Sequence, residues 1–257
     1  MRPPGFAPVA LAETTYAPLT ENVGADKRAQ LDAFGDLLFG EAMPAGYIGD
    51  CSRMELDLRH ILDSILPAIA PESRPLFPLY TDKPMQVFDL GAGAGLPSLP
   101  LAILFPQHTF HLLDSQEKRC RFAKEAADKV GLTNVKVYHG VIQDFPAKYG
   151  KDLKADVVVF RAFRKILASL ELALHILRPT GSPKVLYWRS QSVPFSETGF
   201  KRVADLGFNI DSFVKFVSAE TILPRGLYTF TKNHPTAQGY PRSWKKISAD
   251  KLVETES

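Results

Sequence analysis

From about residue 85 onward, short apolar runs alternate along the chain with longer segments of helical period. The apolar runs predict strands at residues 85–90, 109–113, 135–139, 156–160 and 184–188. The segments between them predict helices after Leu96, over residues 116–130 and over residues 165–177. Such alternation is typical of an α/β protein in which helices cover both faces of a parallel sheet.

The last two apolar runs predict a different connection. Residues 208–217 and 227–232 are separated only by residues 218–226, too few for the helix that a parallel crossover usually contains. They should therefore pair antiparallel. The expected fold is a mostly parallel seven-stranded sheet whose last strand is antiparallel, as in the class I (Rossmann-like) methyltransferases.

The N-terminal part of the chain has a different pattern. Helical period runs over residues 27–42 and again over residues 52–70. The second of these segments has an apolar stripe that consists of Leu58, Ile61, Leu62, Ile65, Leu66 and Ile69. The predicted divisions are a loose proline-rich arm at 1–25, a helical cap and linker at 26–84, the core at 85–235 and a basic tail at 236–257.

The first core strand runs into three closely spaced glycines, Gly91, Gly93 and Gly95. Glycines are needed where the backbone adopts positive φ or passes close to a ligand. The spacing differs from the G-x-G-x-x-G of dinucleotide sites, and Asp89 would repel a pyrophosphate. A carboxylate there suits the amine of S-adenosylmethionine, which we therefore predict as the cofactor. The alternative is a strand–helix turn that binds nothing.

A second acid follows the second core strand. Asp114 is placed to hold the hydroxyls of a ribose, with Ser115 beside it. The alternative is that Asp114 or Ser115 caps the next helix, with Glu117 completing a capping-box pattern. Both roles can coexist.

Composition narrows the class of protein. The chain has 257 residues, 45% of them hydrophobic, and its net charge of +3 with a pI near 8.7 permits nucleic-acid binding without requiring it. Cys51 and Cys120 fit no metal or redox spacing, and the six histidines form no ligand pattern. No segment has the roughly 20 apolar residues of a membrane helix. We expect a cytoplasmic monomer without a metal ion.

Several motifs together resemble one family, the glucose-inhibited division protein B family of small-subunit ribosomal RNA guanine-N7 methyltransferases. The motifs are RHILDS at residues 59–64, DLGAGAGLP at 89–97, LLDS at 112–115 with KR at 118–119, FRA at 160–162 and YPR at 240–242. The chain departs from the family pattern at residues 98–99, 140–143, 188–189 and 243–246.

The resemblance implies S-adenosylmethionine as methyl donor, and ribosomal RNA or the small ribosomal subunit as partner. It places Gly91 and Leu96 beside the donor, and Ile142 and Gln143 at its adenine end. Guanine N7 has a free lone pair and no proton, so the reaction needs no general base, and we predict no catalytic side chain. The competing functions are methylation of a small molecule and a non-catalytic RNA-binding role in assembly.

Cations are expected to complete the site. Arg161 follows the fourth core strand, where such sheets open their ligand crevice, and can hold a phosphate or the cofactor carboxylate. The alternative is an ion pair. A basic rim is predicted to contact RNA phosphates; it consists of Lys118, Arg119, Arg121, Lys165, Arg242 and Lys246. For Lys118, Arg119 and Arg121, a solvated surface position is the alternative.

Overall fold

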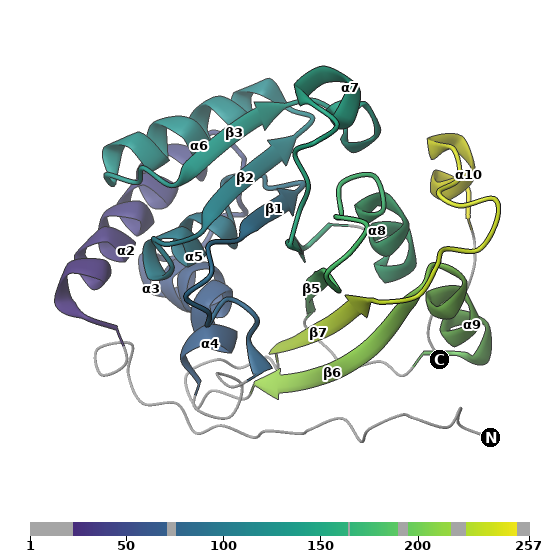
Figure 1. Cartoon of the computed structure of the whole chain (residues 1–257). Helices are drawn as coiled ribbons and strands as arrows, with labels where there is room; N and C mark the ends of the chain where they lie inside the picture. The colour runs from purple at the N-terminus through teal and green to yellow at the C-terminus, as the bar shows by residue number, and fades with distance from the viewer. Residues whose placement is uncertain (1–22, 71–75, 164, 190–194, 217–224, 251–257) are drawn as a thin grey trace.

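The computed structural model describes residues 23–70, 76–163, 165–189, 195–216 and 225–250. Their centre is one seven-stranded sheet in the order β3-β2-β1-β4-β5-β7-β6 (Figure 1). The strands are β1 (Gln86–Leu90), β2 (Thr109–Asp114), β3 (Val135–His139), β4 (Val157–Arg161), β5 (Lys184–Arg189), β6 (Phe208–Phe216) and β7 (Arg225–Lys232). Strands β1 to β5 are parallel, and β7 runs antiparallel to β5 and β6. The predicted fold class is confirmed.

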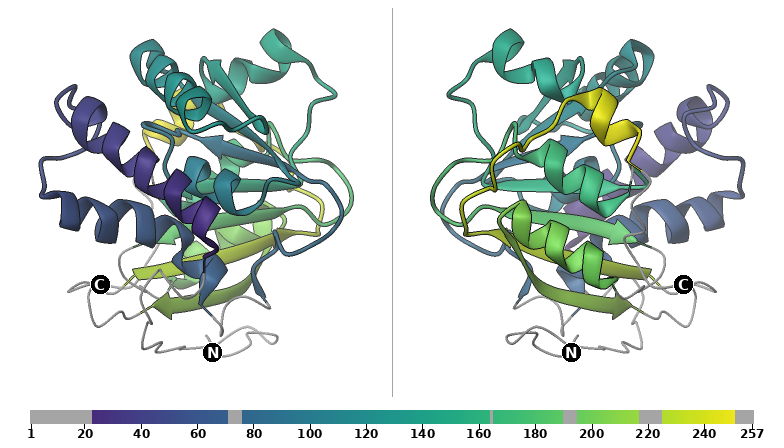
Figure 2. Two further views of the ribbon diagram at one scale, coloured as in Figure 1. Left: turned by 90° about the vertical axis from the view of Figure 1, so that its left-hand side faces the viewer. Right: turned by 90° about the vertical axis from the view of Figure 1, so that its right-hand side faces the viewer.

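The central strands read as near-continuous apolar runs because helices bury both of their faces. Along β1, Val87 belongs to the hydrophobic cluster on one face and Phe88 to the cluster on the other. The first face is covered by α2 (Ala25–Leu37), α4 (Asp63–Ile69), α5 (Ser98–Leu104) and α6 (Glu117–Lys129). The second is covered by α7 (Phe145–Tyr149), α8 (Ile166–Ala173), α9 (Glu197–Asp205) and α10 (Trp244–Ser248) (Figure 2).

The helices were predicted less completely than the strands. The sequence pattern did not indicate α7, α9 or α10. Ser196 nevertheless gives a local signal for α9, because its hydroxyl accepts a hydrogen bond from the Gly199 amide at the start of the helix. The helix predicted over residues 165–177 ends earlier, at Ala173. Most of the predicted arm at residues 1–25 lies outside the described residues.

The predicted cap helices exist, but each contains a π-helical segment. Helix α2 continues into η1 (Leu38–Ala42), and α3 (Arg53–Leu56) is joined to α4 by η2 (Asp57–Leu62). Such wider turns leave backbone groups available to other partners and are frequent near functional sites. In the described part of the chain, no helix is long and apolar enough to cross a membrane.

Pro67 lies inside α4 and therefore cannot donate to the carbonyl of Asp63, four residues earlier. The indole Nε1–H of Trp188, at the end of β5, donates to that carbonyl at 3.0 Å instead. A break in the helical hydrogen-bond pattern is thus used to attach the cap to the sheet.

Candidate active site

The turn after β1 has the conformation that its glycines predicted. Gly91, Gly93 and Gly95 have φ of +89°, +55° and +90°. The Gly91 amide donates to the Leu113 carbonyl at 2.8 Å, which fixes the turn against the end of β2. A Cβ added at Gly91 would lie 2.4 Å from Cδ2 of Phe163. The turn is therefore closely packed at Gly91.

Asp114 stabilises the same turn from the end of β2. Its Oδ2 accepts from the Gly93 amide at 2.9 Å, and its Oδ1 accepts from the Gln116 amide at 2.8 Å. The alternative helix-capping role is not what the structure shows, because the N-cap of α6 is Gln116 and no side chain caps it. The capping box lies elsewhere, at Ser52 and Glu55.

A first cavity of about 1010 Å³ opens beside this turn, and we call it the cofactor cavity. Of the predicted cofactor residues, it is lined by Gly91, Asp114, Ser115, Ile142 and Gln143. These come from the ends of β1 and β2 and from η4 (Ile142–Asp144), which follows β3. The structure thus brings together side chains that are up to 52 residues apart in the sequence.

Asp89 is a buried acid with an unpartnered oxygen beside the glycine turn. Its side chain is 1% exposed, and its Oδ2 has no hydrogen-bond partner among the described residues. Burial raises the pKa of this carboxyl to about 8; Asp114 adds to the effect, whereas Ser98 opposes it. A buried acid with unused acceptor capacity next to a glycine turn fits the ammonium group of S-adenosylmethionine. Asp89 itself does not line either cavity of the site.

Two further orphaned atoms lie in side chains that line the cofactor cavity. Nε of Arg119 and Nε2 of His175 are buried without a partner in the described part of the protein. Buried polar atoms are normally satisfied, so these two indicate that a polar ligand completes the cavity.

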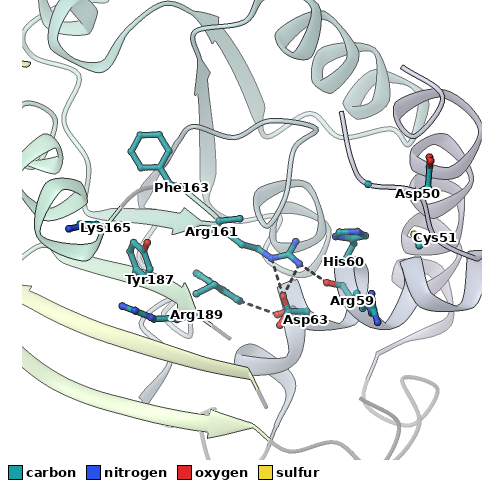
Figure 3. Close-up of a pocket in the computed structure, with 13 residues that line it drawn as sticks. Asp50, Cys51, Arg59, His60, Asp63, Arg161, Phe163, Lys165, Tyr187 and Arg189 are labelled. Atoms are coloured by element: carbon teal, nitrogen blue, oxygen red, sulfur yellow. Dashed lines mark hydrogen bonds and ion pairs between the residues drawn. The ribbon is translucent and has the colours of Figure 1, made fainter. Parts of the chain in front are cut away.

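A second cavity, of about 770 Å³, lies between the cap and the ends of β4 and β5 (Figure 3). We call it the cap cavity. It shares Ala162 and Phe163 with the cofactor cavity, so the two spaces meet at the loop after β4. Its basic lining side chains are Arg59, His60, Arg161, Lys165 and Arg189, and its acidic ones are Asp50 and Asp63.

Arg161 binds the cap. Its Nη2 lies 2.7 Å from Oδ2 of Asp63 and donates to the Arg59 carbonyl at 2.5 Å, and its Nε donates to Asp63 at 3.0 Å (Figure 3). The two side chains are only 12% and 7% exposed. Arg161 thus forms the ion pair that was the alternative prediction, and this pair is buried. The assignment of Arg161 to the cofactor stays a prediction.

The residues of the predicted basic rim lie in several different environments. Arg119 lines the cofactor cavity and Lys165 lines the cap cavity, whereas Lys118, Arg121 and Lys246 are exposed outside both. Arg242 is held internally by the carboxylates of Glu171 and Asp250 at 2.7 Å each, because a buried acid on α8 needs a counter-charge. Arg242 also lines the cofactor cavity, and its contact with RNA stays a prediction.

Gly93, Gly95 and Leu96 line neither cavity, and their predicted contact with the cofactor stays untested. The sequence reasoning missed Phe163 and Trp244, both of which line the cofactor cavity. Phe163 directly follows the quoted FRA motif, so that motif was a usable signal. No sequence signal indicated Trp244 other than its position in the basic tail. No group of three metal-ligating side chains occurs within the described ranges.

A mostly parallel sheet of this strand order, with β7 antiparallel between β5 and β6, a glycine turn after β1 and an acid at the end of β2, is the arrangement of a class I S-adenosylmethionine-dependent methyltransferase. The family model described as rRNA small subunit methyltransferase G matches residues 27–203. The chain belongs to this family, as its motifs predicted.

Individual relatives agree with this assignment. The ribosomal RNA small subunit methyltransferase G of Lactiplantibacillus plantarum is 32% identical over 189 residues, covering 73% of this chain and 75% of its own length. That of Lactococcus lactis subsp. cremoris (strain SK11) is 32% identical over 195 residues with the same coverage. Among solved structures, a point mutant of MtNAS has a TM-score of 0.50 and 14% identity over 81% of this chain and 75% of its own, which is a likeness of fold.

We expect Gly91→Ala to weaken binding of S-adenosylhomocysteine at least tenfold. The new Cβ would collide with Phe163, and the alanine would have to adopt an unfavourable positive φ. The matched control is Gly131→Ala, where φ is +77° and nothing lies within 4 Å of the added Cβ. Both variants should lose roughly 1–2 kcal/mol of stability. Calorimetric titration and thermal unfolding measure the two effects; equal affinities in both variants would contradict the role of Gly91.

Proposed function

We propose that this methyltransferase transfers the methyl group of S-adenosylmethionine to N7 of a guanine in small-subunit ribosomal RNA. The observation that carries the proposal is the pair of adjoining cavities in a chain of this family. One cavity is lined by five of the residues predicted to hold the methyl donor, and the other, beside the cap, is lined by basic, acidic and aromatic side chains. The relatives named above are ribosomal RNA small subunit methyltransferases.

In this proposal the cofactor supplies an activated methyl group on its sulfonium, and the protein binds and orients the reactants. Asp89 takes the ammonium group, Asp114 the ribose, and Ile142 and Gln143 the adenine. Asp114 is well prepared for this role, since its two backbone hydrogen bonds already fix the carboxylate and leave lone pairs for further donors.

The acceptor base enters the cap cavity. A purine can stack on the rings of Phe163 or Tyr187, and Lys165 and Arg189 can approach its phosphate. Guanine N7 needs no proton removed, so placement in line with the methyl group is the main requirement. Water exclusion and positioning by the cap then replace acid–base chemistry.

The test is incubation with S-adenosylmethionine labelled in its methyl group and either small ribosomal subunits, deproteinised small-subunit RNA or large-subunit RNA. We expect label in small-subunit RNA alone, recovered as 7-methylguanosine after digestion to nucleosides and mass spectrometry. Label only in small molecules would overturn the RNA acceptor, and label on another atom would overturn the N7 assignment.

The raised pKa of Asp89 gives a second prediction. At pH 7 a carboxyl with a pKa of about 8 is mostly protonated, and pairing with an ammonium group favours its ionised form. Cofactor binding should therefore release about one proton at pH 7. Above pH 9 the carboxyl is already ionised, so the number of protons released should approach zero. Titration calorimetry in buffers of different ionisation enthalpy measures this release.

Asp89→Asn is the control for that experiment, because the side chain keeps its shape and cannot titrate. It should bind the cofactor more weakly and release no proton. Proton release that persists in Asp89→Asn would assign the ammonium group to another acid.

The exposed rim residues give a third prediction. Lys118→Gln, Arg121→Gln and Lys246→Gln together should weaken RNA binding and reduce the slope of log K against log salt by roughly 0.7–0.9 for each lost phosphate contact. Cofactor affinity should stay unchanged, because these side chains line neither cavity.

The matched control neutralises three other cations, Lys124, Lys129 and Lys201, and should leave the salt slope as it was. A slope that stays unchanged in the first triple variant would mean that RNA approaches another face of the protein.

A further inference from the structure

The C-terminal segment forms one wall of the cofactor cavity. After β7 the chain crosses to α8, and α10 lies beside that helix (Figure 1). Pro241, Ser243 and Trp244 line the same cavity as Asp114 and Ile142. Residues from the tail and from the strand ends therefore face one space.

The segment is held in place by a buried acid. Glu171 of α8 is 1% exposed, and the fork of Arg242 donates to both of its oxygens at 2.7–3.0 Å. The Arg242 backbone amide also donates to Glu171 at 2.6 Å. A buried carboxylate is costly unless it is paired and hydrogen-bonded. Both requirements are met only when the segment lies against α8.

A second acid fixes the far end of α10. Asp250 pairs with Arg242 at 2.7 Å and with Arg202 of α9 at 3.0 Å. The guanidinium groups of both arginines also lie over the ring of Tyr240, at 5.4 and 5.5 Å from its centroid. Contacts on both sides of α10 thus determine where this helix lies.

This arrangement places the indole of Trp244 at the wall of the cofactor cavity. Trp244 is 39% exposed, and Val141, which precedes η4, is 46% exposed in the same cavity. Large apolar side chains held at a cavity wall with this much exposure are typical of ligand sites. The flat face of an adenine ring is the part of S-adenosylmethionine that matches them.

We propose that Trp244 stacks on the adenine of the cofactor, and that Arg242 is a positioning residue that holds Trp244 there through Glu171. The proposal concerns the cofactor alone and does not depend on which acceptor is methylated. Loss of the stacking between an aromatic side chain and a base should weaken cofactor binding by about tenfold.

Tryptophan fluorescence tests the contact directly, because the chain has only two tryptophans. Trp188 is buried and donates to the Asp63 carbonyl, whereas Trp244 is the exposed one. S-adenosylhomocysteine, added without RNA, should quench the emission of the full-length protein. In Trp244→Phe the quenching should disappear while affinity falls only slightly, and in Trp244→Ala affinity should fall about tenfold.

The positioning role has its own readout. Glu171→Gln should weaken the hold on Arg242 and reduce both the quenching amplitude and the affinity. Asp211→Asn is the control, since it removes an ion pair with Lys184 (3.0 Å) on strands β5 and β6 without touching the tail; it should leave both values unchanged.

Quenching that survives in Trp244→Phe would overturn the proposal. It would also be overturned by quenching that appears only when RNA is added, because Trp244 would then contact the acceptor. Glu171→Gln that stays folded and keeps full quenching would overturn the positioning role of Arg242 alone.

Discussion

Asp63 joins the N-terminal cap to the carboxyl ends of two central strands. Its carboxylate pairs with Arg161 at the end of β4, and its carbonyl accepts from Trp188 at the end of β5. The carbonyl is available because Pro67 cannot donate to it. Removing one partner of such a buried ion pair typically costs about 3–5 kcal/mol, since the other charge is left unpaired. Asp63 is therefore the polar contact that fixes the cap to these strand ends, beside the apolar packing of α2 and α4 on α5.

That junction determines the shape of the site. The cofactor cavity is formed largely by strand ends and the loops after them, which the paired sheet keeps rigid, whereas one side of the cap cavity is formed by η2. The loop between the two cavities passes through Ala162, which adopts a φ of +49° that is uncommon for a residue with a Cβ. Strain of this kind persists where the surroundings enforce it and is frequent at functional sites.

The sequence predicted what depends on local pattern. All seven strands were found. The central strands read as apolar runs because both of their faces are buried, and the edge strand Val135–His139, although only partly buried, was found with its observed bounds. The glycine turn and Asp114 were found because positive φ and strand-end acids leave local signals. Short helices such as α7 and α10, with five residues each, leave too few periodic positions to detect.

The partners of Arg161 and Arg242 could not be predicted from local sequence pattern. Arg161 meets Asp63 across 98 residues of sequence, and Arg242 meets Glu171 across 71 residues. Both are predicted to meet anionic ligands, and the structure shows that both also hold an accessory segment to the core with their forked donors. Lysine, with a single flexible ammonium, would be a poor substitute at such fork-to-carboxylate contacts.

This use of arginine bears on how the protein can bind RNA. The most firmly held guanidinium groups near the two cavities are committed to Asp63 and to Glu171, one on the cap side and the other on the tail side. Under the proposed function, phosphate contacts are then left mainly to exposed cations such as Lys118 and Lys246, whose flexible ammonium groups give affinity without a fixed register. In that proposal register comes from the shape of the cap cavity and from the base inside it. The acceptor is then recognised chiefly by what fits between cap and sheet, where Asp63 joins the two.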